Sequence, residues 1–220
     1  MNVPEKMNFI KEIIDPQSSD KILNIGIGWE AQTERMLEEN IAEIWGADID
    51  TKKIKLWKPR LKKTRIVYFD AGIELKGELK KKENYFDKII LLEVAEHIKN
   101  DFQVMKNINK LLKKDGKLII SVPTICFAHS ISPLNYYAHY RHYSKNSLTK
   151  LLEKTRFKIK EIHYVGNWLF NFNLYWSLIV RYVFKREFKL SDSIFTKSYG
   201  KSWGKGRKEG MSIILKAIKI

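Results

Sequence analysis

The sequence predicts an α/β fold in which helices cover both faces of a mostly parallel β-sheet. Short apolar runs alternate along the chain with segments whose apolar residues recur every three or four positions. This alternation is typical of strand–helix–strand crossover units. The chain has 220 residues, of which 44% are hydrophobic and 30% are charged. Such a chain can form one self-sufficient core, so we expect a single domain over residues 1–220.

The first half of the chain alternates between helix and strand. A short amphipathic segment ends at Asp15-Pro16, which predicts a leading helix, and the compact run KILNI before Gly26 predicts the first strand. A lysine-rich helix is stopped near Pro59. We expect helices over 8–14, 31–39 and 52–61, and strands over 21–25, 41–47, 66–69 and 86–92.

The second half continues the same pattern. Asn100 is a suitable N-cap for a helix whose apolar residues run to Leu112, and Ser144 opens a further helix through Leu152. Asp115-Gly116 turns the chain into a strand that Pro123 ends. The remaining strands are expected over 117–122, 157–165 and 211–220.

Residues 164–208 are predicted to form a cap inserted before the last strand. Residues 164–203 hold 12 of the 27 aromatic side chains, and helical faces here would be apolar nearly all round. Such a surface must be covered by the core, a second subunit, a lipid chain or a membrane interface. Arg181 and Lys185 lie among basic residues that would place positive charge at its edge. We therefore expect a substrate-facing cap, and a roof over the sheet or a homodimer contact stays open.

The net charge of +16 is unevenly distributed along the chain. Residues 1–50 hold 4 basic and 11 acidic residues, whereas residues 51–65 hold eight basic residues and no acid. The excess favours a phosphate, nucleic-acid or anionic membrane partner, and a lysine-rich solvated surface explains it equally well.

The sequence also bears on location. Asn171, Asn173 and Arg181 interrupt the one long apolar stretch, which argues against a membrane span, and no signal peptide is visible at the N-terminus. The single cysteine, Cys126, excludes an internal disulfide framework and a cysteine-rich zinc site. We expect a cytoplasmic protein, with a peripheral membrane position as an open alternative.

A glycine turn follows the first predicted strand, in Asn24-Ile25-Gly26-Ile27-Gly28. Glycines at a strand-to-helix turn let backbone approach a ligand, and the next helix offers free N–H groups. Asp48 ends the second strand 22 residues after Gly26, where a carboxylate can accept the hydroxyls of an adenosine ribose. Gly26-x-Gly28-x-x-Ala31 also satisfies the dinucleotide-binding pattern, so these residues alone predict only a nucleoside site.

The order of several motifs is more specific. The chain carries, in succession, ILNIGIGWE, IWGADID, YFDAG, YFDKIILLEVAEHI, DGKLIISVP and HYRHYS. Over about residues 20–165 it resembles the class I S-adenosylmethionine-dependent methyltransferases, closest to the small-molecule and lipid-type branch that includes ubiquinone-biosynthesis enzymes. The resemblance implies a seven-stranded Rossmann-like sheet whose last strand is antiparallel. It also implies S-adenosylmethionine as the cofactor.

The resemblance assigns cofactor-binding roles to ten positions. It implies that the glycine loop passes under the methionine part of the cofactor, that Asp48 binds the ribose and that Asp70 lies near the adenine amino group. Two positions depart from the usual pattern, because Asn24 stands where an acid is common and Glu30 stands where a third glycine is common. The expected cofactor-binding residues are Asn24, Gly26, Gly28, Glu30, Asp48, Ile49, Asp70, Ala71, Glu93 and Val94.

Methyl transfer needs a nucleophile held near the methyl carbon and a group that manages the proton of that nucleophile. The Asn/Asp-Pro-Pro-aromatic motif of amino-group methylation is absent after the fourth strand, so an oxygen nucleophile is the default. Histidine suits a base near neutral pH, and His139 and His97 are the candidates, with Arg141 as a grip for an anionic substrate. Packing or capping is the alternative role for each. No histidine pair has metal-ligand spacing with a third ligand, so no metal is expected.

Two classes of function therefore stay open for this sequence. The first is O-methylation of a small-molecule, lipid or glycan acceptor. The second is RNA or tRNA methylation, which the positive charge and the aromatic residues would support through base stacking. A cofactor-binding partner protein without catalysis is a further alternative, and Glu30 is the residue that would explain it.

Overall fold

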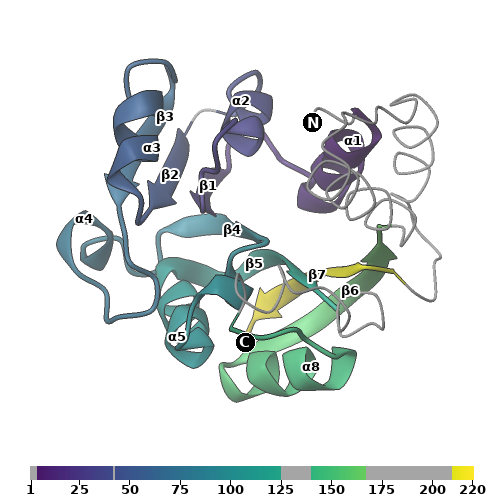
Figure 1. Cartoon of the computed structure of the whole chain (residues 1–220). Coiled ribbons are helices and arrows are strands. Elements are labelled where there is room, and N and C mark those ends of the chain that lie inside the picture. Colours follow the sequence, from purple (N-terminus) through teal and green to yellow (C-terminus); the bar gives the residue numbers. More distant parts are fainter. Residues whose placement is uncertain (1–3, 42, 125–139, 167–209) are drawn as a thin grey trace, which may run out of the picture.

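The computed structural model describes residues 4–41, 43–124, 140–166 and 210–220, which form a seven-stranded β-sheet with helices on both faces (Figure 1). The strand order is β3-β2-β1-β4-β5-β7-β6, and β7 runs antiparallel to both of its neighbours. The fold class predicted from the sequence is confirmed. The strands are β1 (Lys21–Ile25), β2 (Glu43–Asp48), β3 (Thr64–Tyr68), β4 (Phe86–Leu92), β5 (Leu112–Pro123), β6 (Phe157–Val165) and β7 (Ser212–Lys219).

The helices α3, α5 and α8 begin at a residue whose side chain caps the first turn. Asn100 accepts a hydrogen bond from the backbone N–H of Gln103 at 3.1 Å, and Ser144 forms a capping box with Ser147. Every helix expected from the sequence is present, and two short elements, α4 and η1, were not expected. The elements are α1 (Pro4–Ile14), α2 (Gln32–Leu37), α3 (Thr51–Trp57), α4 (Gly77–Lys80), the 3₁₀ helix η1 (Ala95–His97), α5 (Asp101–Leu111) and α8 (Lys145–Lys154).

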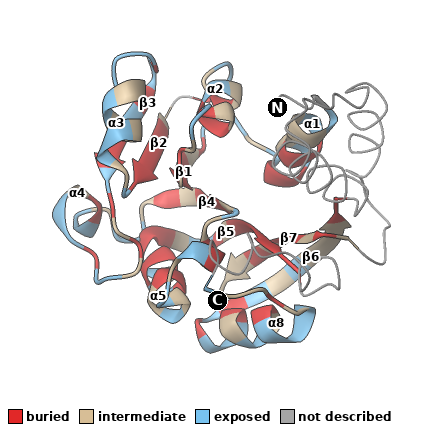
Figure 2. Ribbon diagram, viewed as in Figure 1, coloured by how far each residue is buried: buried red, intermediate tan, exposed pale blue. Residues whose placement is uncertain are grey.

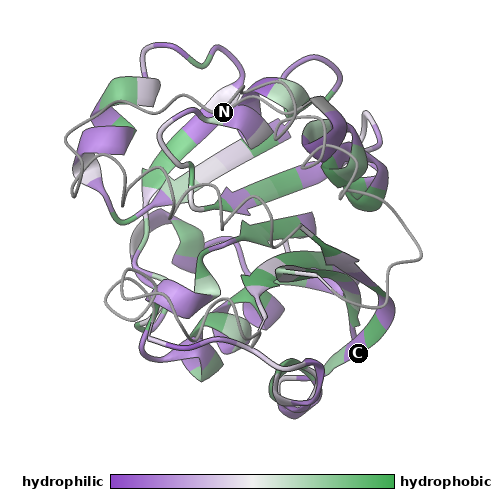
Figure 3. Cartoon of the chain, turned by 45° about the vertical axis from the view of Figure 1, so that its right-hand side comes forward, coloured by the Kyte–Doolittle hydropathy of each residue, from purple (hydrophilic) through white to green (hydrophobic). Residues whose placement is uncertain are grey.

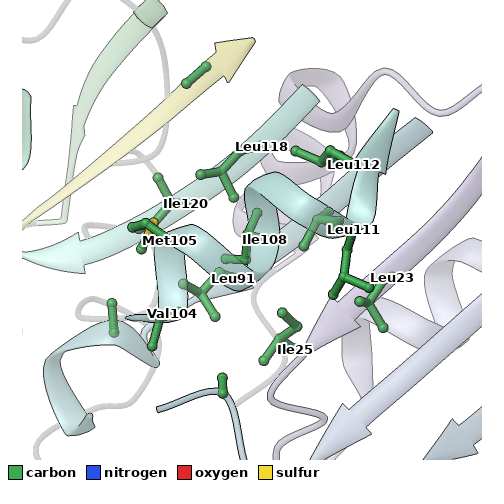
Figure 4. Close-up of a cluster of buried hydrophobic side chains, with 14 of the residues drawn as sticks. Leu23, Ile25, Leu91, Val104, Met105, Ile108, Leu111, Leu112, Leu118 and Ile120 are labelled. Atoms are coloured by element: carbon green, nitrogen blue, oxygen red, sulfur yellow. The ribbon is translucent and has the colours of Figure 1, made fainter. Parts of the chain in front are cut away.

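The sheet is buried on both faces because alternate side chains of each strand enter different cores. On one face, α1 and α2 pack over a row of isoleucines contributed by five strands. On the other face, Met105 and Ile108 of α5 lie against Leu91, Leu118 and Ile120 of β4 and β5 (Figure 4). Buried residues concentrate in the strands and in the inner faces of the helices, and the central strands are mainly hydrophobic (Figures 2 and 3).

The strand order places a crevice at the carboxyl ends of β1 and β4. From β1 the chain proceeds outward through β2 and β3, and from β4 it proceeds in the opposite direction through β5. Loops that leave two such neighbouring strands diverge, and ligands of open α/β sheets bind in the opening between them. The fold therefore directs the search for a site to the loops after β1 and β4.

The expected cap falls largely on residues that the structure does not describe. Of the expected cap over 164–208, Tyr164 and Val165 complete β6, and 167–208 lie outside the described residues. Within the described part of the chain, no helix has the length and apolarity needed to cross a membrane.

Candidate functional site

Two adjoining pockets lie at the carboxyl ends of the parallel strands. The larger has a volume of about 660 Å³ and is lined by loops that follow β1, β2, β3 and β4. The smaller has a volume of about 480 Å³ and lies between the glycine turn, α1 and the start of β7. Gly26, Gly28, Leu92 and Glu93 line both. Each volume lies within the range of small-molecule sites in proteins.

The glycine turn separates the two pockets and exposes its backbone to them. Gly26 has φ +93°, and a Cβ atom added there would lie 2.4 Å from Cγ2 of Val94. Gly28 has φ +69°, and a Cβ atom there would meet no heavy atom of the described residues within 4 Å. Both positions need the left-handed conformation that glycine adopts readily. Gly26 is thus required by packing, whereas Gly28 leaves room for a ligand against the backbone.

Asp48 supplies a nearly buried carboxylate to the larger pocket, with 5% of its surface exposed. Its Oδ2 accepts a hydrogen bond from the backbone N–H of Ile27 at 3.0 Å, and its Oδ1 accepts one from the backbone N–H of Asp50 at 2.9 Å. The ammonium of Lys53 lies 3.7 Å from Oδ2. A carboxylate has about four acceptor positions, so this arrangement leaves capacity for the hydroxyl groups of a ligand.

The larger pocket also has an apolar wall. Ile49 and Ile73 line it, although 56% and 44% of their surfaces are exposed. Ala71 and Val94 contribute further apolar surface, and Asp70 is fixed beside them because its Oδ1 accepts the backbone N–H of Gly72 at 2.9 Å. Exposed isoleucines beside a fixed carboxylate suit a flat heteroaromatic ring that carries a hydrogen-bond donor.

Glu93 stands where the two pockets meet. Its φ of +53° is unusual for a residue other than glycine, and such strain is found most often at functional sites. The hydroxyl of Ser121 donates to Oε1 of Glu93 at 2.7 Å, and the backbone N–H of Glu93 donates to the carbonyl of Ser121 at 3.0 Å. Ser121 of β5 therefore fixes both the backbone and the carboxylate of Glu93.

The two positions that depart from the resembled pattern line the smaller pocket. Asn24 is 2% exposed, and its side-chain amide donates to Glu34 and to the carbonyl of Gly26. Glu30 is exposed, and its carboxylate accepts a hydrogen bond from the side chain of Gln32. The ten residues expected to bind a cofactor are thus brought together around the two pockets.

The three catalytic candidates have different surroundings. His97 lines the larger pocket with 46% of its side chain exposed, and its Nε2 lies 3.8 Å from a carboxylate oxygen of Glu96. Arg141 forms an ion pair with Asp101 and donates to the carbonyl of Lys99. In the structure Arg141 therefore anchors its own loop to Asp101 and to the backbone of Lys99. His139 lies outside the described residues.

Glu96 is a buried acid beside the site. Its surface is 1% exposed, and neither carboxylate oxygen has a hydrogen-bond partner among the described residues. Burial and the neighbouring charge of Glu93 raise the pKa of Glu96 to about 8. At neutral pH the carboxyl is mostly protonated, so it holds a proton next to His97.

Several pocket residues were not expected from the sequence. Lys53 comes from the lysine-rich α3, and Lys99 and Tyr140 reach the larger pocket from segments far apart in the chain. Ser121 could have been found from strand register, because it pairs with Leu92 in the β4–β5 ladder. No three His, Cys, Asp or Glu side chains within the described ranges come close enough together to hold a metal ion.

Comparisons with known proteins identify the family that the chain resembles. Residues 23–120 match the family model described as a methyltransferase domain. The fold is similar to that of a putative methyltransferase from Bacillus halodurans, with a TM-score of 0.66 and 18% identity, in a match that covers 97% of this chain and 98% of the other. These findings confirm the resemblance to class I S-adenosylmethionine-dependent methyltransferases.

Curated relatives match only part of the chain. A ubiquinone biosynthesis O-methyltransferase from Pelagibacter ubique is 32% identical over 54% of this chain and 52% of its own length. A tRNA U34 carboxymethyltransferase from Idiomarina loihiensis is 26% identical over 49% of this chain and 34% of its own length. The chain thus spans about half the length, or less, of these curated relatives.

Proposed function

We propose that this chain, whose residues 23–120 match the methyltransferase domain family, transfers a methyl group from S-adenosylmethionine to an oxygen atom of a small-molecule, lipid or glycan acceptor. The observation that carries the proposal is the pair of adjoining pockets on either side of one glycine turn. One pocket suits a nucleoside, and the other suits a second, smaller reactant.

The residues of the larger pocket fit S-adenosylmethionine. The open space over Gly28 lets backbone approach the methionine part, Asp48 can accept the two ribose hydroxyls, and Ile49 and Ile73 provide apolar surface for adenine. Asp70 lies where it can accept a hydrogen bond from the adenine amino group. When bound, the cofactor supplies an electrophilic methyl group on a positively charged sulfur.

The smaller pocket is the proposed acceptor site. Met7 and Ile10 of α1 and Ile214 of β7 offer apolar contacts, and Ser121 and Glu93 offer polar contacts at the boundary with the cofactor pocket. Residues at that boundary can orient a hydroxyl group toward the methyl group and exclude water around it. We propose that His139 removes the hydroxyl proton. The residue that follows it, Tyr140, lines the larger pocket.

Methyl transfer from labelled S-adenosylmethionine tests the proposed acceptor class. The purified chain is incubated with the labelled cofactor and with lipid, glycan, small-molecule and RNA fractions of the same cells, and mass spectrometry locates the label. We expect an O-methyl product in a lipid, glycan or small-molecule fraction. Label on a nitrogen or carbon atom, or only in RNA, would contradict the proposal.

A second candidate, RNA methylation, is favoured by the surface around α3. This helix buries none of its residues, and Lys53 lies 5.6 Å from the ring centre of Trp29, which is 62% exposed. Arg60 lies 5.7 Å from the ring centre of Trp57. Aromatic and cationic side chains next to a pocket suit a single-stranded polyanion.

Salt dependence separates the two candidates. Binding of tRNA through α3 should weaken steeply as salt rises, because each phosphate contact releases counterions. Binding of an apolar acceptor should hardly change. The expected cap over 164–208 adds a further test, because lipid-facing basic residues predict binding to anionic vesicles that is absent with neutral ones. Salt-sensitive tRNA binding without vesicle binding would favour the RNA candidate.

A further inference from the structure

A buried carboxyl group is connected to the glycine turn through one side-chain amide. Glu34 of α2 is fully buried, and Asn24 of β1 is 2% exposed. The Nδ2 group of Asn24 donates to Oε1 of Glu34 at 2.6 Å and to the carbonyl of Gly26 at 3.2 Å. The position of the Gly26 carbonyl therefore depends on an amide that Glu34 holds.

The second oxygen of this carboxyl group makes no compensating contact. Oε2 of Glu34 is buried and has no hydrogen-bond partner among the described residues. Leaving a charged oxygen unpaired is costly, so a structural role alone is a poor reason to keep an acid here. A glutamine would keep the hydrogen bond to Asn24 without a charge. The presence of glutamate rather than glutamine at position 34 is therefore better explained by a role for its negative charge.

The groups that face Glu34 oppose its ionisation. Asp48 on β2 and Glu38 at the end of α2 are both acidic, whereas the side chain of Asn24 and the backbone of Glu34 itself favour the charged form. Burial, opposed by the Asn24 hydrogen bond and supported by the two acids, raises the pKa of Glu34 to about 7. The ammonium of Lys53 lies 3.7 Å from Oδ2 of Asp48, so its ion-pair partner is Asp48 and not Glu34.

We propose that Glu34 is a positioning residue whose carboxylate fixes the glycine turn through Asn24 and becomes ionised as a positively charged cofactor binds above that turn. The inference rests on the proposed use of S-adenosylmethionine. An ionised acceptor strengthens the hydrogen bond from Asn24, and a cation in the larger pocket, which Gly26 lines, favours the ionised form. Binding and loss of the proton therefore support each other.

Titration calorimetry measures this coupling directly. At pH 7, binding of S-adenosylmethionine by the wild-type protein should release up to about half a proton, visible as different heats in two buffers of unequal ionisation enthalpy. Its affinity should rise about three- to tenfold between pH 6 and pH 8. Glu34→Gln keeps an acceptor for Asn24 and cannot ionise, so both effects should largely disappear.

Two further variants serve as controls. Glu39→Gln removes an exposed carboxylate five residues along the chain and should leave proton release unchanged. Glu96→Gln removes a second buried acid whose pKa is raised, so release that persists in Glu34→Gln and disappears in Glu96→Gln belongs to Glu96. Proton release that is the same in Glu34→Gln as in the wild type would overturn the inference.

A wild-type measurement keeps the proposal testable if Glu34→Gln fails to fold. The side-chain amide signals of Asn24 in NMR spectra should titrate near pH 7 without the cofactor and at lower pH with it. Signals that do not titrate, or that titrate identically with cofactor bound, would refute the coupling. If the wild-type protein binds no S-adenosylmethionine at any pH, the proposed function itself is wrong.

Discussion

Gly26 and Gly28 should differ sharply in what an added methyl group costs. Gly26→Ala places Cβ 2.4 Å from Cγ2 of Val94, and it must also keep a φ of +93°. Backbone strain of about 1–3 kcal/mol and overpacking of about 1–3 kcal/mol together predict a loss of about 2–6 kcal/mol in the free energy of unfolding. Gly28→Ala has no such neighbour among the described residues, so we expect about 1 kcal/mol from its backbone alone.

Urea denaturation of the ligand-free protein checks these values. Val94→Ala removes the atom that clashes, so in the Gly26→Ala background it should restore about 1–3 kcal/mol relative to the sum of the single changes. The same Val94→Ala change should show almost no coupling with Gly28→Ala. Equal destabilisation by the two glycine variants, or no coupling at Val94, would refute the steric reasoning.

The same variants separate stability from ligand binding. The methyl group of Gly28→Ala would enter the space that we assign to the cofactor, although the folded protein tolerates it. We therefore expect the dissociation constant for S-adenosylmethionine to rise tenfold or more, roughly 1.4 kcal/mol, in a variant that remains folded at 25 °C. An unchanged dissociation constant would mean that the cofactor does not approach this backbone.

Three further predictions follow from the site. Asp48→Asn should weaken cofactor binding by about 1.5–3 kcal/mol in calorimetry, because the ribose hydroxyls lose a charged acceptor. An unchanged affinity would show that the ribose does not bind at Asp48. The pKa of Glu96 rises from 4.5 to about 8 on folding, so the folded state retains a proton that the unfolded chain loses, and stability falls with rising pH across that window. Glu96→Gln should flatten this fall in urea denaturation at pH 5, 7 and 9, and an unaltered pH profile would contradict the raised pKa. His139→Ala should lower turnover about 100-fold or more with cofactor affinity nearly intact, and full activity would eliminate it as the base.

The order of elements could be predicted from the sequence because the central strands β1 and β4 are short apolar runs, and α5 and α8 bury apolar residues that recur every three or four positions. The range expected for β1 and the range expected for β4 agree with the structure at both ends. The boundary between α5 and β5 was less clear, because Leu111 ends the helix and Leu112 already begins the strand. Both leucines are buried, so hydropathy does not separate them.

Short elements were missed for a physical reason. α4 has four residues and η1 has three, so neither repeats an apolar spacing often enough to be recognised. η1 nevertheless matters to the site, because it carries His97 outward into the pocket and buries Glu96. The sequence analysis named His97 as a candidate base, but only the tertiary structure shows that His97 is exposed and that Glu96 beside it is buried.

The Asn24 position illustrates what a sequence pattern leaves out. Read alone, asparagine in place of an acid implies that the glycine turn has lost a negative charge. The structure places a carboxyl group from α2, ten residues further along the chain, on the amide of that asparagine. Only packing of α2 against the ends of β1 and β2 brings them together.

The acidic residues of the larger pocket contrast with the positive net charge of the chain, and this contrast bears on how the proposed cofactor binds. The chain carries a net charge of +16, yet the carboxylates of Asp48, Asp70 and Glu93 line the larger pocket. A cationic cofactor is attracted by these local acids, because short distances and partial burial outweigh the screened charges of the distant surface. Once the methyl group has left, the sulfur is neutral and this attraction is lost, while the hydrogen bonds to the ribose remain. The acids at the site therefore favour the methylated form of the cofactor over its product.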